Sequence, residues 1–86
     1  MATLITQDGD VIDNYDASTL EKMEEAVGGF VQHIKTVLDI DLCVNEQAAL
    51  LGLKPNAMAS ALAGELVLGD VLMLNNKEAK QKANHE

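Results

Sequence analysis

The sequence predicts a small α+β domain, in which an antiparallel sheet of about four to five strands packs on one main helix, with a second short helix and a polar C-terminal tail. Two observations carry this prediction. A capped amphipathic segment at residues 18–27 ends at two glycines, and short β-prone runs on both sides of it are separated by turn signals. We expect residues 1–74 to form one domain and residues 75–86 to form the tail.

The composition restricts which residues can build the hydrophobic core and indicates the cellular compartment. Hydrophobic residues make up 48% of the 86 residues, but Trp is absent and there is one Phe and one Tyr, so the core must be aliphatic. The single cysteine, Cys43, cannot form an internal disulfide, which favours a reducing cytoplasm. Because no stretch approaches the ~20 apolar residues of a membrane span, we expect a protein that is neither exported nor embedded.

The charge is strongly acidic. Fourteen Asp and Glu residues face six lysines, with no arginine, and give a net charge of −8. Such a field repels a phosphate backbone, and the bidentate arginine contacts to phosphate and guanine are missing, so we expect no nucleic-acid binding. An acidic surface instead steers a small protein toward a basic partner.

Residues 2–15 are predicted to form a β-hairpin, because an Asp8-Gly9 pair lies between two β-prone runs where a tight turn needs positive φ. Asp8, Asp10 and Asp13 together invite a calcium-loop interpretation. Ile12 occupies a ligand position of such a loop, which excludes that interpretation.

The main helix has start and stop signals. Ser18 and Glu21 match the reciprocal capping box, in which each side chain accepts from the backbone amide of the other residue. Gly28 supplies the left-handed residue that closes a helix, and Gly29 lets the chain reverse. The predicted apolar stripe consists of Leu20, Met23, Ala26 and Val27.

After the helix, residues 30–37 and 41–44 are predicted to be strands of an antiparallel hairpin, connected through residues 38–41. Its two soft ligand candidates are His33 and Cys43. Two ligands on one hairpin do not make a zinc site, so a half-exposed histidine and a buried thiol are the simpler interpretation, and we expect no metal and no cofactor.

Residues 45–56 are predicted to be a loop packed by its leucines, because Gly52 and Pro55 interrupt any helical turn. Asn56 can cap a short helix over residues 57–63 that ends at Gly64.

Residues 65–74 read as an apolar strand with a bulge or bend at Gly69-Asp70. The run is too apolar on both faces for a solvated edge, so we expect it in the middle of the sheet or at an interface. Together with the small-residue helix before it, this strand predicts a homodimer.

Four motifs resemble a family of short uncharacterised domains found mostly in bacteriophages and mobile elements. Residues 27–32 read V-G-G-F-V-Q, Asn45-Glu46 follows, residues 52–56 read G-L-K-P-N, and residues 69–72 read G-D-V-L. The family has V-G-G-(Y/F)-(I/V)-E, an N-E-E-G loop, G-L-P-x-N and a final G-D-V strand. The resemblance covers residues 18–74 and implies a phage or mobile-element accessory protein, with no established activity.

The chain departs from the family pattern at three places. Gln32 stands where the family has Glu, Ala48 where it has Gly, and Lys54-Pro55 where Pro comes first.

The sequence favours a protein that is not an enzyme. Neither histidine has a Ser or Cys partner in a motif, Cys43 has no basic neighbour to lower its pKa, and no phosphate-cradling glycine loop with lysine is present.

Two functions follow as hypotheses. The first is a non-enzymatic accessory protein of phage that binds and modulates a host protein in the host cytoplasm. The alternative is a counter-defence protein that sequesters a small nucleotide signalling molecule, although the lack of arginine argues against it. The candidate binding residues are Gly28, Gly29, Gln32, Asn45, Glu46 and Asn56. The glycines also fit a simple helix end, and the two asparagines fit turn and cap positions.

Overall fold

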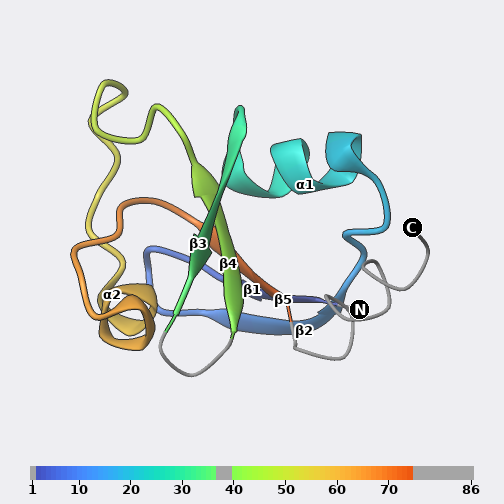
Figure 1. Ribbon diagram of the computed structural model, residues 1–86, viewed down its shortest axis with the longest axis horizontal. Helices are drawn as coiled ribbons and strands as arrows, with labels where there is room; N and C mark the ends of the chain where they lie inside the picture. The colour runs from blue at the N-terminus through green and yellow to red at the C-terminus, as the bar shows by residue number, and fades with distance from the viewer. Residues whose placement is uncertain (1, 37–39, 75–86) are drawn as a thin grey trace.

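The computed structural model describes residues 2–36 and 40–74, and in this part of the chain it shows a five-stranded antiparallel sheet with two helices (Figure 1). The predicted tail at 75–86 and part of the predicted connection at 38–41 lie outside the described residues. The strands are β1 (Ala2–Ile5), β2 (Val11–Tyr15), β3 (Val31–Lys35), β4 (Asp41–Asn45) and β5 (Val71–Leu74), and the helices are α1 (Leu20–Val27) and α2 (Ala57–Ala63). The predicted α+β class is confirmed.

The sheet consists of two hairpins joined by the last strand. Its order is β2-β1-β5-β4-β3, so β5 lies between β1 and β4 and pairs antiparallel with both. The expectation that the final strand lies in the middle of the sheet is confirmed. Three of its side chains, Val71, Leu72 and Leu74, are at most 3% exposed. The apolar strand that suggested a homodimer is therefore buried within one chain, and self-association stays a prediction.

The β1–β2 hairpin closes as its turn residues require. Gly9 has φ +96°, which is the left-handed region that glycine favours. Its amide donates to the Thr6 carbonyl at 3.0 Å, and the Thr6 amide donates to the Asp10 carbonyl at 2.9 Å. The predicted turn at Asp8-Gly9 is confirmed.

The predicted cap of α1 is wrong by one residue. Thr19, not Ser18, is the N-cap, and its side chain accepts from the Lys22 amide at 3.2 Å. The reason is that the Asp16 carboxylate already accepts from the Ser18 amide at 3.0 Å, which places Ser18 in the turn before the helix. The predicted end is confirmed, since Gly28 is left-handed and its amide donates to the Glu24 carbonyl.

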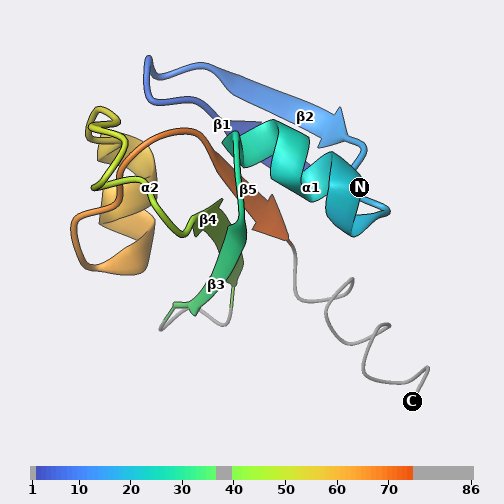
Figure 2. The same ribbon diagram turned by 90° about the horizontal axis from the view of Figure 1, so that it is seen from above.

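The two helices cover opposite faces of the sheet and lie at opposite ends of the domain (Figures 1 and 2). Neighbouring residues in a strand point to opposite faces, so Cys43 packs with Met23 and Ala26 of α1, whereas Leu42 packs with Ala59 of α2. Leu20 was expected in the buried stripe of α1 but is 61% exposed.

The hairpin of β3 and β4 forms as predicted, with unbroken register from Val31–Asn45 to Lys35–Asp41. Its first strand is shorter than predicted, because Phe30 precedes β3 and is 61% exposed. Residue 37, the last residue of the predicted strand, lies outside the described residues. Cys43 is fully buried, as expected, and its Sγ lies 3.7 Å from Nδ1 of the exposed His33.

The strand predicted over residues 65–74 is wrong in its first half. Only Val71–Leu74 is a strand, while Leu68 forms an isolated bridge with Pro55. Residues 67–69 do not join the sheet because their backbone bonds to residues 54–56 instead. The Asn56 amide donates to the Val67 carbonyl at 2.8 Å, and the Gly69 amide donates to the Lys54 carbonyl at 2.7 Å.

The loop after β4 does not pack by its leucines as predicted. Leu50 and Leu51 are 86% and 57% exposed, whereas Ala48 is buried and Leu53 is half-buried. The segment turns back on itself, with the Leu53 amide donating to the Ala48 carbonyl at 3.1 Å, so the two leucines lie on the outside of the turn. The short helix α2 is confirmed, with Asn56 as its N-cap and Gly64 as its left-handed end.

Candidate functional site

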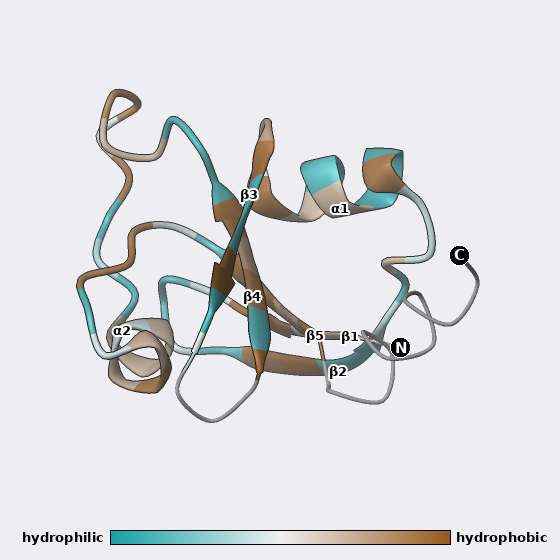
Figure 3. Cartoon of the chain, viewed as in Figure 1, coloured by the Kyte–Doolittle hydropathy of each residue, from teal (hydrophilic) through white to brown (hydrophobic). Residues whose placement is uncertain are grey.

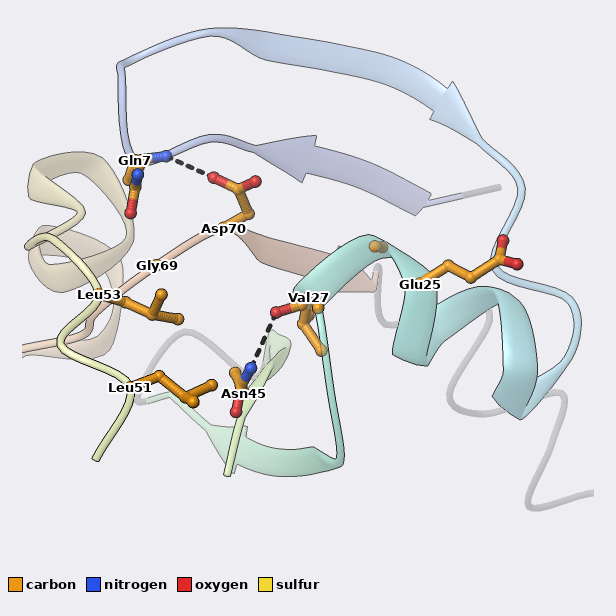
Figure 4. Close-up of a pocket in the computed structure, with 10 residues that line it drawn as sticks. Gln7, Glu25, Val27, Asn45, Leu51, Leu53, Gly69 and Asp70 are labelled. Carbon is orange, nitrogen blue, oxygen red and sulfur yellow. Dashed lines mark hydrogen bonds between the residues drawn. The ribbon is translucent and has the colours of Figure 1, made fainter. Parts of the chain in front are cut away.

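Two hollows lie near the predicted binding residues. The first, which we name the α1 cleft, has a volume of about 230 Å³ and lies at the C-terminal end of α1 (Figure 4). It is lined by Gln7, Glu25, Ala26, Val27, Gly28, Asn45, Leu51, Leu53, Gly69 and Asp70.

Most polar groups that face the α1 cleft are already used by the fold. Asn45 Nδ2 donates to the Val27 carbonyl at 3.1 Å, and the Gln7 amide donates to Asp70 Oδ1 at 2.9 Å (Figure 4). The ionisable side chains of the lining, Glu25 and Asp70, are both acidic, and the helix end beside them carries partial negative charge. The α1 cleft therefore disfavours an anionic ligand.

The two glycines at the end of α1 serve the helix. The amides of Gly28 and Gly29 both donate to the Glu24 carbonyl, at 2.8 and 3.0 Å. A Cβ on Gly29 would lie 2.9 Å from Asn45 Nδ2, so that glycine is needed for the close approach of the asparagine. Neither amide is left to cradle a phosphate.

The second hollow, which we name the β3 groove, lies beside β3 on the face of the sheet opposite α1. Its volume is about 250 Å³. It is lined by Gln32, Ile34, Val44, Asn45, Glu46, Ala48, Ala49, Glu65, Leu66, Val67 and Leu68.

The β3 groove combines an apolar floor with an acidic rim. Val44 and Val67 are buried and form part of the floor. The carboxylates of Glu46 and Glu65 are exposed at the rim, and none of the described residues in the lining is basic. An apolar centre with a charged rim is the arrangement found in many protein interfaces.

Large apolar side chains are exposed close to the β3 groove. Leu66 of its lining is 72% exposed. Phe30, which is 61% exposed, accepts through its carbonyl from the Glu46 amide at 2.8 Å, and Leu50 follows the lining residue Ala49. Figure 3 shows hydrophobic stretches at the start of β3 and in the loop after β4. Exposed apolar side chains that gather in one region mark binding surfaces.

The structure therefore brings together some of the predicted binding residues and separates others. Gln32, Asn45 and Glu46 line the β3 groove, and Gly28 lines the α1 cleft. Asn56 lines neither hollow. It is 1% exposed and donates through Nδ2 to the carbonyls of Ile5 and Gly69, so no atom of its side chain is available to a ligand.

The second carboxylate of the groove, that of Glu65, was not singled out from the sequence. Glu65 was assigned to the final strand, although its position directly after the helix stop Gly64 is a signal for an exposed loop. The apolar run that begins at Leu66 was considered as a desolvated binding centre, and of that run Leu66, Val67 and Leu68 line the groove.

Among residues 2–36 and 40–74, no group of three or more His, Cys, Asp and Glu side chains could hold a metal ion.

No helix in the described ranges has both the length and the apolar character needed to cross a membrane.

The fold and its hollows define a small α+β domain with an acidic surface groove. Residues 1–84 match the family described as Domain of unknown function (DUF3846), and the chain belongs to that family. Comparisons with curated proteins and with solved structures give no match.

Proposed function

We propose that this domain is a non-enzymatic protein-binding module that holds a basic, partly apolar segment of another protein in the β3 groove. The observation that carries the proposal is the pairing of exposed Leu66 with the carboxylates of Glu46 and Glu65 around a buried apolar floor. Burying the apolar side chains supplies binding free energy, and the two carboxylates select a partner of opposite charge.

The charge of the whole chain supports the same class of partner. A net charge of −8 without arginine raises the rate at which a basic protein approaches and repels acidic ones. The resemblance to bacteriophage domains suggests the setting, so we propose a host protein in the host cytoplasm as the partner, bound and modulated during infection.

The alternative, sequestration of a nucleotide, gains no support from the geometry. A phosphate needs amide donors or cations, whereas the amides of Gly28 and Gly29 are occupied and the α1 cleft beside them is lined by Glu25 and Asp70. Among the residues first suggested for a base or ribose, Asn56 is buried in the fold.

The proposal is tested by capture from host lysate at low salt, with two charge-matched double variants. Glu46→Gln with Glu65→Gln removes two carboxylates from the groove, and Asp8→Asn with Asp10→Asn removes two from the exposed β1–β2 turn. We expect wild type and the turn variant to capture the same basic protein, and the groove variant to bind it roughly 5–30-fold more weakly, at about 0.5–1 kcal/mol per pair. Equal binding by the two variants, or no protein captured by wild type, would contradict the proposal.

A further inference from the structure

Strand β3 forms one edge of the sheet, and the only described strand that pairs with it is β4. The hydrogen bonds at the two ends of this pair show which of its backbone groups point outward. The Glu46 amide donates to the Phe30 carbonyl, and the Thr36 amide donates to the Ile40 carbonyl. In an antiparallel ladder, hydrogen-bonded and non-hydrogen-bonded pairs alternate, so the pair of His33 with Cys43 is non-hydrogen-bonded.

The amides and carbonyls of Val31 and His33 therefore point away from β4, toward the open side of the sheet. A row of such groups is a template for another strand.

The opposite edge of the sheet is protected. The register of β1 with β2 shifts between Ala2 and Leu4, and Asn14 has φ +59° within β2. Asp13 adds a negative charge to that strand. An irregular edge strand resists pairing, whereas β3 runs in unbroken register, contains no acidic residue and has its lysine, Lys35, at its last position.

We propose that the partner segment binds as an added β-strand along the edge of β3, with basic side chains at alternate positions that lie over the β3 groove. This inference rests on the proposed function and names the conformation and pattern of the segment. Side chains of the added strand that share the face of Gln32 and Ile34 enter the groove that Glu46 and Glu65 also line. The side chains between them share the other face, beside Val31 and His33.

The charge pattern favours a basic segment over a second copy of this chain. In a pair of β3 edges, the side chains that each copy would bring to the groove of the other are Gln32 and Ile34, and neither is basic. Each copy also carries a net charge of −8.

The test uses a fluorescein-labelled peptide of seven alternating lysines and valines, with its binding measured by fluorescence anisotropy at low salt. His33→Pro removes an outward amide without breaking the β3–β4 ladder, since proline is tolerated where the amide faces out from an edge strand. The matched control is Val11→Pro on β2. There the Thr6–Asp10 bond makes the next pair, Ile5 with Val11, non-hydrogen-bonded, so the Val11 amide also points outward.

We expect wild type and Val11→Pro to bind the peptide equally, and His33→Pro to bind it at least about tenfold more weakly. A second peptide, N-methylated at alternate residues on the edge that would face β3, keeps its lysines and should lose binding to wild type. Because it is tested against the wild-type protein, that peptide shows whether binding uses an added strand even if circular dichroism finds that His33→Pro does not fold.

Three results would overturn the inference, each in a distinct way. The first result is full binding by His33→Pro or by the N-methylated peptide, together with weaker binding by the Glu46→Gln, Glu65→Gln variant. It would exclude binding as an added strand and leave the groove as the binding site. The second result is no binding of the peptide to wild type. It would exclude a partner segment with alternating basic residues, whereas the capture from lysate tests the proposed function independently. A wild-type dimer in sedimentation equilibrium that His33→Pro dissociates assigns the edge to a second copy.

Discussion

Replacing Asn56 by alanine should destabilise the domain far more than removing an ordinary helix cap. The Asn56 side chain is 1% exposed, accepts from the Ala59 amide at 3.0 Å, and donates to the Ile5 and Gly69 carbonyls at 2.9 Å each. It therefore connects the N-terminus of α2, the end of β1 and the segment before β5.

The expected magnitude follows from those three hydrogen bonds. Losing the cap costs about 1 kcal/mol, and leaving two buried carbonyls without this donor costs roughly 1–1.5 kcal/mol each. The sum of about 3–4 kcal/mol is a large share of the roughly 5–15 kcal/mol that holds a typical domain. It corresponds to a fall of roughly 12–32 °C in Tm for a chain of this size.

Thr19→Ala is the matched control. Thr19 caps α1 through one hydrogen bond to the Lys22 amide and is exposed, so its removal should cost only about 1 kcal/mol. Asn56→Ser, which keeps a capping oxygen but loses the amide donor, should fall between Thr19→Ala and Asn56→Ala. Urea denaturation followed by circular dichroism measures all three variants. If Asn56→Ala lies within about 1 kcal/mol of Thr19→Ala, the two carbonyl bonds contribute nothing and the reasoning fails.

Two further predictions concern α1 and its ends. Gly29→Ala should lose about 1–3 kcal/mol of stability in urea denaturation, because its Cβ would lie 2.9 Å from Asn45 Nδ2, and Asn45 is held by the Val27 carbonyl and the Gln47 amide. Adding Asn45→Ala should cost less than the sum of the two single changes, and strict additivity would contradict the clash. Hydrogen bonds from Lys22 and then from Ser18 lower the pKa of the Asp16 carboxyl to about 2. Its small, solvent-screened contribution to stability is therefore present above the ordinary pKa of 3.8 and is lost as the pH falls toward 2. An NMR titration of Asp16 should show this midpoint, and an unperturbed midpoint in wild type would refute the interaction.

The parts of the fold that sequence could predict are those fixed by residues close together in the chain. The turn at Gly9 and the helix ends at Gly28 and Gly64 all require positive φ, which glycine adopts most readily. Asn56 caps α2 by bonding an amide three residues ahead, a contact that needs no distant partner.

The errors arose where a competing partner decided the outcome. Ser18 lost the capping position because the Asp16 carboxylate accepts its amide. The apolar run before β5 is not a strand because the segment near Asn56 takes its hydrogen bonds, through the bond from the Asn56 amide to the Val67 carbonyl. Such a pairing joins residues eleven positions apart, and the hydrophobic pattern of the run alone cannot show it.

The candidate site was predictable only in part for the same reason. Gln32 lies on β3 and Glu46 directly follows β4, and the antiparallel pairing of these two strands places both residues in the β3 groove. Glu65 comes from a distant segment that crosses the same face, so its contribution depends on tertiary structure.

The central position of β5 also determines when the domain can be completed during translation. A nascent chain that has emerged from the ribosome as far as Asp70 can already close the β1–β2 and β3–β4 hairpins. The strand that joins them is then still inside the ribosome. Until Val71–Leu74 emerges, the inner edges of both hairpins stay unpaired. Synthesis of nearly the whole domain must therefore precede its cooperative folding, and a chain cut short before β5 leaves two hairpins with no strand to join them.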